Sequence, residues 1–134
     1  MSALTSTALK SLLTILACLA MTACNTTRPT NAGLAHDVYF TLKDKSPGAQ
    51  QALVAGCYGI LAPISGIVFL AAGTRDTELD REVNDVDYDV SLHVYFTDRA
   101  AHDAYQDDPK HTEFIETFKD NWESVRVFDS ILTN

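Results

Sequence analysis

The sequence predicts an α+β domain whose elements follow one another in the order strand, helix, strand, strand, helix, strand. Two observations support this prediction. Apolar and polar residues alternate with a period of two in three short stretches, which is typical of half-buried strands. Between them lie longer stretches in which apolar residues recur at helical spacing after a capping residue and a proline.

The first half of the domain is expected to form a strand, a helix and a second strand. The first strand begins near His36, where every second residue is apolar: Val38, Phe40 and Leu42. Ser46-Pro47 begins a helix that ends before Pro63, with an apolar face made of Ala49, Leu53, Cys57, Ile60 and Leu61. The apolar run Ile67 to Ala72, closed by Gly73, indicates a buried strand.

The second half begins with a polar, acidic loop over residues 75–89. Alternation then predicts a third strand on Val90, Leu92, Val94 and Phe96. Thr97-Asp98 caps a short helix and Asp108-Pro109 restarts it, after which one helical face carries His111, Phe114, Ile115, Phe118 and Trp122. The alternating residues Val125 and Val127 indicate the last strand.

This order is the split βαβ arrangement of ferredoxin-like folds, in which helices cover one face of a four-stranded antiparallel sheet. If the even-numbered residues of the first and third strands face the helices, the other face is mixed and aromatic: Tyr39, Thr41, Ser91, His93 and Tyr95. Such a face is a surface for self-association, and a two-fold dimer is the commonest way to cover it. We therefore expect a homodimer.

Charge and histidine spacing argue against several kinds of partner. The chain has 10 Lys and Arg against 18 Asp and Glu, for a net charge of -8, whereas nucleic-acid binders need clustered cations. We expect no nucleic acid as a partner.

Cys57, on the apolar face of the first helix, is interpreted as a small core residue. His93, His102 and His111 have no close His or Cys partner at zinc-site spacing, so we expect no metal.

Residues 1–23 have the features of an export signal peptide. Lys10 is the only charged residue, and the apolar run from Leu12 to Ala20 is too short to span a membrane. The segment Met21-Thr22-Ala23-Cys24 resembles the lipobox at which bacterial lipoproteins are cleaved and acylated, although the lipobox prefers Leu at the position of Met21. The sequence therefore predicts a lipoprotein held on the lipid bilayer through an acylated Cys24, with plain secretion as the alternative.

Residues 24–34 then form a polar, lipid-anchored tether that holds a domain at residues 35–134 off the membrane. The lipoprotein would face the periplasm from the bacterial cell membrane or the outer membrane. Asn25 follows the cysteine where an Asp would resemble an inner-membrane retention signal. This difference favours the outer membrane of a two-membrane bacterium.

A set of motifs follows in fixed order from His36 to about Ser130. It comprises His36-Asp37-Val38-Tyr39-Phe40, Gly73, Tyr88-Asp89, Tyr105, Pro109-Lys110-His111 with Phe114, Trp122 and Val127-Phe128-Asp129. Together these residues resemble the stress-responsive dimeric α/β-barrel (Dabb) family. The resemblance implies a dimer whose two sheets pack into a central barrel. Many members of the family have no assigned activity.

One enzyme of this family, the plant polyketide cyclase olivetolic acid cyclase, pairs a tyrosine with a histidine six residues further on. The resemblance places this catalytic pair at Tyr105 and His111. The histidine would remove a proton from a carbon next to a carbonyl, while the tyrosine hydroxyl orients a substrate oxygen. The cyclase has a further histidine where this chain has Val90. The alternative interpretation is that both side chains serve only to pack a helix junction.

The pair would point into a pocket between the helices and the sheet. The expected pocket residues are His36, Val38, Phe40, Val90, Leu92, Phe114, Trp122, Val125, Val127 and Asp129. His36 either lines this pocket or bonds to its neighbours, and Asp129 either lines it or accepts hydrogen bonds at the strand end. A pocket with these apolar walls suits a small, flat, apolar ligand.

Two functions follow as expectations. The first is a non-catalytic, membrane-tethered homodimer that holds a small apolar ligand or a partner protein. The second is a cofactor-free lyase or cyclase in which His111 is the general base. Haem-degrading and quinone-forming monooxygenases occur in other dimeric ferredoxin-like families, but no motif here calls for haem, and we expect no cofactor.

Overall fold

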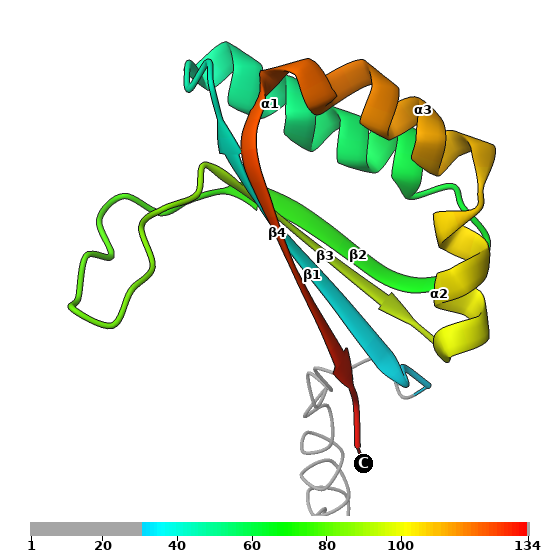
Figure 1. Ribbon diagram of the computed structural model, residues 1–134. Helices are drawn as coiled ribbons and strands as arrows, with labels where there is room; N and C mark the ends of the chain where they lie inside the picture. Colours follow the sequence, from blue (N-terminus) through cyan, green and yellow to red (C-terminus); the bar gives the residue numbers. More distant parts are fainter. Residues whose placement is uncertain (1–30, 134) are drawn as a thin grey trace, which may run out of the picture.

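The computed structural model describes residues 31–133 and contains one four-stranded sheet. The strands are β1 (Leu34–Leu42), β2 (Ile67–Thr74), β3 (Val90–Phe96) and β4 (Trp122–Ile131). All neighbouring strands are antiparallel, and their order in the sheet is β2-β3-β1-β4 (Figure 1). The ferredoxin-like fold class predicted from the sequence is confirmed.

The helices cover one face of this sheet (Figure 1). α1 (Pro47–Gly56) continues into a π-helical turn, η1 (Cys57–Leu61), while α2 (Arg99–Gln106), α3 (Pro109–Phe118) and a 3-10 turn, η2 (Lys119–Asn121), connect β3 to β4. The predicted caps are in place. Side chains of Ser46, Asp98 and Asp108 each accept a hydrogen bond from a backbone N–H in the first turn of the helix that follows.

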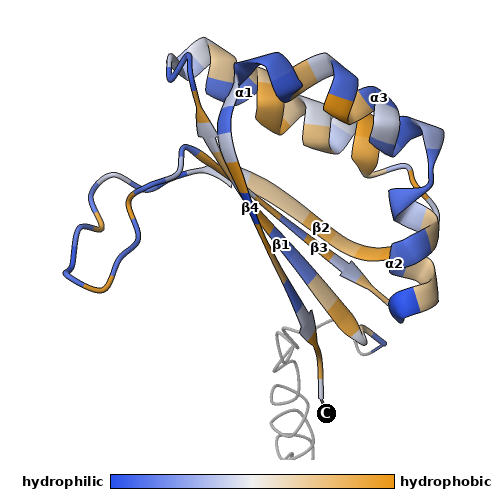
Figure 2. Ribbon diagram, viewed as in Figure 1, coloured by the Kyte–Doolittle hydropathy of each residue, from blue (hydrophilic) through white to orange (hydrophobic). Residues whose placement is uncertain are grey.

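The core lies between the helices and the two central strands. The apolar helix-facing residues of β1 and β3 are at most 5% exposed, among them Val38, Phe40, Leu42, Val90, Leu92, Val94 and Phe96. The helices contribute Leu53, Cys57, Leu61, Tyr105 and Phe114 to the same cluster. Burial of each large apolar side chain is worth about 1.5–3 kcal/mol. Figure 2 shows the corresponding hydrophobic stretches along the strands and helices, and the predicted alternation is confirmed.

Cys57 is a core residue, as expected from its place on the apolar face of the first helix. Its side chain is fully buried in η1. Burial raises the pKa of the Cys57 thiol to about 12. The group therefore stays a neutral thiol at physiological pH and acts as a small hydrophobe.

Trp122 differs from its predicted place. Helical spacing assigns it to the last helix, but α3 ends at Phe118 and Trp122 opens β4. It pairs with Leu42 where the register between β1 and β4 shifts. Its ring still packs against Phe40 and Phe114, with ring centroids 5.2 and 6.1 Å away. A tryptophan on the last helix would also face these neighbours, so the spacing of apolar residues alone does not distinguish a helical Trp122 from one that opens a strand.

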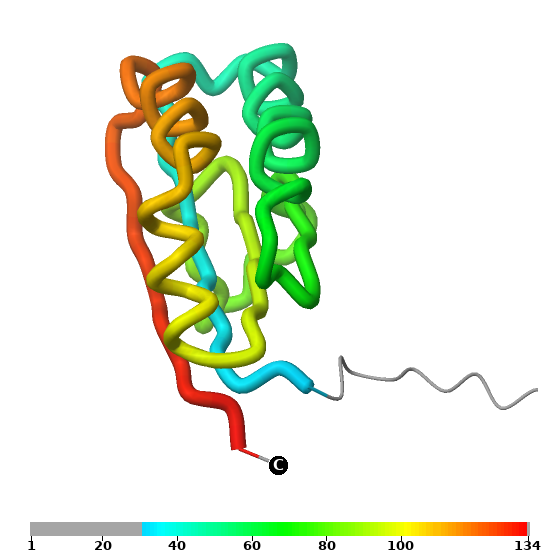
Figure 3. Tube along the Cα trace, turned by 90° about the vertical axis from the view of Figure 1, so that its right-hand side faces the viewer, coloured from blue at the N-terminus to red at the C-terminus, as the bar shows by residue number. Residues whose placement is uncertain are grey.

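α1 and α3 lie side by side over the sheet (Figure 3), and they approach closely at Gly56. A Cβ atom on Gly56 would lie 2.3 Å from Cε2 of Phe118, which is far inside carbon–carbon contact distance. The Phe118 ring therefore lies against the bare backbone of α1. Gly59, in the following π-helical turn, has nothing within 4 Å of a Cβ atom added there.

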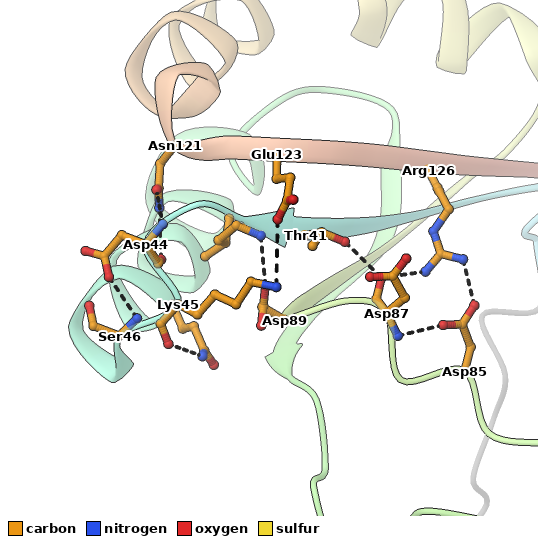
Figure 4. Close-up of polar contacts among 12 residues, drawn as sticks. Thr41, Asp44, Lys45, Ser46, Asp85, Asp87, Asp89, Asn121, Glu123 and Arg126 are labelled. Atoms are coloured by element: carbon orange, nitrogen blue, oxygen red, sulfur yellow. Dashed lines mark hydrogen bonds and ion pairs between the residues drawn. The ribbon is translucent and has the colours of Figure 1, made fainter. Parts of the chain in front are cut away.

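The acidic loop between β2 and β3 extends away from the sheet and is held at its C-terminal half (Figures 1 and 4). Arg126 of β4 donates hydrogen bonds to the Asp85 carboxylate at 2.6 Å and to the Asp87 carbonyl at 2.8 Å. Thr41 donates to the same carbonyl. Asp89 accepts a hydrogen bond from the backbone of β1. The end of the loop is thus fixed to β1 and β4.

The last residues of the expected tether take part in the fold. Leu34 is the first residue of β1 and is 3% exposed. Gly33 donates its N–H to the Phe96 carbonyl and accepts a hydrogen bond from the N–H of Leu132. A Cβ on Gly33 would lie 2.4 Å from the carbonyl oxygen of Thr97, so this close approach requires glycine.

The expected signal peptide, residues 1–23, and the expected lipidation site Cys24 lie outside the described residues. Within residues 31–133, no helix is long and apolar enough to cross a membrane. Export and lipid anchoring therefore stay predictions from the sequence.

Candidate functional site

A pocket of about 400 Å³ lies between α2, α3 and the half of the sheet formed by β1 and β4. It brings together all but one of the expected site residues: His36, Val38, Phe40, Leu92, Tyr105, His111, Phe114, Trp122, Val125, Val127 and Asp129. The exception is Val90, which is fully buried in the core. The pocket also contains three residues that the sequence did not suggest: His102, Gln106 and Ile115.

The sheet side of the pocket follows from the register of β1 and β4. Val38 is paired with Val127, and Phe40 is paired with Val125. Because β4 is an edge strand, Val125 and Val127 are left 38% and 49% exposed. The pocket therefore opens beside β4, and its sheet side is apolar.

The rings of Tyr105 and His111 pack against each other at a tilt of 48° where α2 meets α3. Their ring centroids are 4.6 Å apart. Tyr105 is 1% exposed, and this burial raises the pKa of its hydroxyl, which therefore stays protonated. The side-chain hydrogen bonds found within residues 31–133 do not include the Tyr105 hydroxyl, although they do include the ring of His111. A purely structural role at the helix junction would therefore explain the His111 ring, which has a backbone partner. It does not explain why the Tyr105 hydroxyl has none among these bonds.

His111 has the protonation state of a general base. Its Nδ1 lies 3.3 Å from the Gln106 carbonyl oxygen, a contact in which Nδ1–H donates and Nε2 keeps its lone pair. Burial lowers the pKa of His111, and the nearby His36 and His102 lower it further, while the bond to the carbonyl acts in the opposite direction. The imidazole is thus neutral at pH 7 and can accept a proton.

His36 both lines the pocket and bonds to a neighbour, so its two expected roles coexist. It is paired directly with Asp129 across β1 and β4, and its Nδ1 lies 2.6 Å from Asp129 Oδ1. The His36 side chain is 7% exposed, whereas that of Asp129 is 46% exposed. The ring centroid of His36 lies 6.1 Å from that of Tyr105. The polar groups of the pocket therefore gather at one end.

His102 completes this polar end. Its ring centroid lies 5.2 Å from that of His36. Its Nδ1 is 3.1 Å from the Asp103 carboxylate, and its Nε2 is 3.2 Å from the Gln106 side-chain nitrogen. The three-residue spacing from Tyr105 is the one sequence signal that could have suggested it, because residues three apart share a helix face.

Trp122 adds an unsatisfied donor near the pocket. The Nε1–H of Trp122 is buried and has no hydrogen-bond partner among the described residues. Buried donors of this kind are uncommon in folded proteins. An acceptor supplied by a bound molecule or by a shift of neighbouring side chains would satisfy it.

The opposite face of the sheet carries a different constellation. A hollow of about 410 Å³ lies there beside the acidic loop and is lined by Asp37, Tyr39, Val83, Asn84, Asp85, Tyr88, Arg126 and Phe128. His93 is on this face, with its Nδ1 2.6 Å from Asp37 Oδ1. His93 is therefore separated from the other three histidines by the sheet.

The sequence matches the family model of the stress responsive A/B barrel domain over residues 34–132. The chain belongs to this family, Dabb. The match covers every strand and helix described above, and it agrees with the expected resemblance. None of the curated proteins matches this sequence.

Solved structures with the same fold include both uncharacterised proteins and an enzyme. A Dabb family protein from Mesorhizobium loti has a TM-score of 0.65 and 23% identity, covering 77% of this chain and 99% of that chain. A dimeric ferredoxin-like protein of unknown function from Thermobifida fusca has a TM-score of 0.62 and 18% identity, covering 76% and 92%. A hydroxynitrile lyase from Passiflora edulis has a TM-score of 0.63 and 18% identity, covering 77% and 95%. At these identities the likeness shows the fold alone.

Proposed function

We propose that this Dabb chain is an exported, membrane-tethered homodimer that binds a small, largely apolar ligand in the pocket beside β4. The pocket itself carries the proposal. Its volume of about 400 Å³, its apolar walls and its few polar groups are the usual properties of a small-molecule site.

The arrangement of the pocket defines the class of ligand. Valine, leucine and aromatic side chains form the walls, and the polar groups of His36, Tyr105 and His111 gather at one end. A flat apolar molecule with one hydroxyl or carbonyl oxygen would place its body against the walls. Its oxygen would meet the protonated Tyr105 hydroxyl or the His111 imidazole.

Ligand binding can be measured through the fluorescence of Trp122, which lines the pocket and is the only tryptophan of the chain. Titration with a series of para-alkylphenols should give a saturable change. Affinity should rise with alkyl length until the pocket is full, because each buried methylene contributes about 0.8 kcal/mol.

Two variants on β4 distinguish the pocket from general hydrophobic adsorption. Val127→Phe narrows the pocket and should weaken binding by at least about tenfold, which corresponds to about 1.4 kcal/mol. Ile131→Phe adds the same group on the same strand outside the pocket and should leave affinity unchanged. Equal weakening in both variants, or no saturable change in the wild-type chain, would contradict the proposal.

The homodimer is supported by the uncovered face of the sheet. This face carries aromatic side chains that remain accessible, among them Phe69 at 40% and Phe128 at 52% exposure. Tyr39 packs edge-on against Phe128, with ring centroids 5.8 Å apart. Solved structures from Thermobifida fusca and Bacteroides fragilis with this fold are described as dimeric. A second copy of the chain would cover these rings and close the two sheets into a barrel.

Membrane tethering is supported by the sequence of residues 1–24. When the full chain is expressed in a two-membrane bacterium, labelled palmitate should be incorporated and the protein should sediment with membranes. Cys24→Ser should abolish the label, and Cys18→Ser should retain it, because only Cys24 stands at the end of the lipobox-like segment. Label retained in Cys24→Ser would rule out this anchor.

The second candidate function is a cofactor-free lyase or cyclase resembling olivetolic acid cyclase. The geometry that favours it is the contact between the His111 and Tyr105 rings, together with the bond from His111 Nδ1 to the Gln106 carbonyl, which leaves Nε2 as the nitrogen that can accept a proton. In this function His111 removes a proton from the substrate as general base while Tyr105 orients a substrate oxygen. The fold shared with a hydroxynitrile lyase supports testing this class.

Turnover separates the enzyme from the binder. The chain would be incubated with an aromatic hydroxynitrile, with release of the aldehyde and cyanide followed, and with a polyketide-like substrate for ring closure. An enzyme should lose at least about 10²-fold of its rate in His111→Ala while the circular dichroism spectrum is kept. His93→Ala, on the other face of the sheet, is the matched control. A binder should show no turnover and change only in affinity.

A further inference from the structure

We propose that His36, His102 and Asp129 form a binding site for a divalent first-row transition-metal ion at the polar end of the pocket. Each residue offers one ligand atom, and these atoms all lie within 4.8 Å of one another. This proposal is separate from the proposed function, because an ion could bind to these three residues whether or not the pocket holds an organic ligand. It also differs from the sequence expectation, which considered only histidines close to one another along the chain.

The donor set suits such an ion. Two imidazoles and one carboxylate are the ligands of catalytic zinc sites and of non-haem iron(II) sites. Metal–ligand bonds of about 2.0–2.2 Å place neighbouring donor atoms about 3–3.5 Å apart. The observed limit of 4.8 Å is therefore within reach of side-chain rotation.

β1 and β4 fix the first two ligands. His36 and Asp129 are directly paired residues of neighbouring strands, so their backbones are held by the sheet. Without an ion, Nδ1 and Oδ1 lie 2.6 Å apart, and Nδ1–H donates a hydrogen bond to the carboxylate. An ion bound to Nδ1 takes the place of the Nδ1 proton, which moves to Nε2 through solvent, so that the imidazole binds as a neutral ligand. The pair needs to open by about 0.4–0.9 Å to reach metal-site distances.

α2 supplies the third ligand already oriented. The Nδ1 of His102 lies 3.1 Å from the Asp103 carboxylate, which accepts a hydrogen bond from Nδ1–H, so that Nε2 carries the lone pair. Nε2 currently lies 3.2 Å from the Gln106 side-chain amide, which is a donor. Metal-binding histidines are commonly held by a carboxylate on their other nitrogen in this way. The Asp103–His102 contact therefore prepares Nε2 as a ligand.

Three protein ligands leave at least one coordination position open. All three residues line the pocket, so the open position faces the space in which a small molecule would bind. The half-exposed Asp129 carboxylate provides a path for the ion from solvent. A ligand oxygen or a water molecule would complete the coordination.

The other face of the sheet supplies an internal comparison. His93 and Asp37 form a pair with the same 2.6 Å separation. Among the described residues, the metal-ligand grouping includes His36 and Asp129 but neither member of this second pair. A His–Asp pair alone therefore does not make the three-residue group, and His102 is what distinguishes the proposed site.

The test uses the full chain, purified without a histidine tag, stripped with EDTA and titrated with Co²⁺ and with Zn²⁺. One Co²⁺ per chain should bind with visible d–d absorption, and Zn²⁺ should displace it and raise the thermal unfolding temperature. His102→Ala should weaken Zn²⁺ binding by on the order of 100-fold and abolish the thermal shift. His93→Ala should bind as the wild type does.

Asp129→Asn gives a second, nearly isosteric variant that keeps an acceptor for His36 and removes the charged ligand, in case His102→Ala does not fold. Circular dichroism of each metal-free variant reports its fold. The proposal is overturned if the wild-type chain binds no stoichiometric ion, or if folded His102→Ala and Asp129→Asn bind as well as the wild type. It is also overturned if His93→Ala loses binding equally. Alkylphenol binding in the stripped chain is scored separately, so failure of the metal site leaves the pocket proposal intact.

Discussion

At the scale of single residues, the neutral state of His111 makes the stability of the fold depend on pH. An unfolded chain binds a proton at this imidazole near its ordinary pKa of 6.5, whereas burial lowers the pKa in the folded chain. Above pH 6.5 both states are neutral and His111 contributes no pH dependence. Below it, the unfolded state holds the extra proton until the folded pKa is reached, so the free energy of unfolding decreases across that range.

The prediction is that His111→Gln flattens the acid side of the stability profile. Urea unfolding, in EDTA, would be measured for both chains between about pH 5 and 7.5, on either side of the ordinary histidine range. The groups that face His111 are His36 on β1, His102 on α2 and Asp108 before α3, and they remain in the variant. The stability advantage of the wild-type chain should shrink as pH falls. A difference that is independent of pH would show that the His111 pKa is not lowered.

The residues of the pocket were predictable to the extent that strand register determines them. Alternation in β1 and β4 places His36, Val38, Val127 and Asp129 on one face, and pairing brings them together without further information. His102 depends instead on how α2 folds back over the start of β1. No periodicity along the chain encodes that approach, so the sequence alone gave no reason to join His102 to His36.

At the scale of elements, the contact between α1 and α3 depends on a missing side chain. Gly56→Ala would force a methyl group into the Phe118 ring, and overpacking of this kind costs about 1–3 kcal/mol. Gly59→Ala, with open space around its Cβ, should be neutral or stabilising by up to about 1 kcal/mol. Chemical denaturation of the two variants provides the measurement.

A second substitution tests whether the clash is the cause. Phe118→Leu in the Gly56→Ala background should recover part of the lost stability, because the smaller side chain makes room for the methyl group. Strictly additive losses would show that the two residues do not interact in this way.

Helices were predicted well wherever a capping residue stood directly before a stretch with helical spacing of apolar residues. Ser46, Asp98 and Asp108 each precede a helix at the expected place. The disagreement at Trp122 arises where the 3-10 turn η2 replaces the last helical turn, since a bulky aromatic residue satisfies both patterns. Propensity and period are local, whereas the end of α3 is decided by the pairing of Trp122 with Leu42.

At the scale of the whole molecule, the uncovered sheet face predicts the assembly state. The domain from Ala32 onward should sediment as a dimer at micromolar concentration. Phe128→Arg replaces an aromatic ring on this face by a long charged side chain and should give a monomer, because the aromatic contact is lost and burying a charge at the interface is costly. Thr112→Arg, on the exposed side of α3, should remain dimeric. Equal masses for the two variants would place the interface elsewhere or exclude a dimer.

The hydrogen bond between Gly33 and Leu132 brings the two ends of the domain together. A short peptide could therefore join them, and new ends could be opened in the loop over residues 75–89, which extends away from the sheet (Figure 1). Such a circular permutant would begin with β3 and end with β2. The ribosome would then deliver the strands in the order β3, β4, β1, β2, while the sheet, the pocket and its histidines would be rebuilt in the same places.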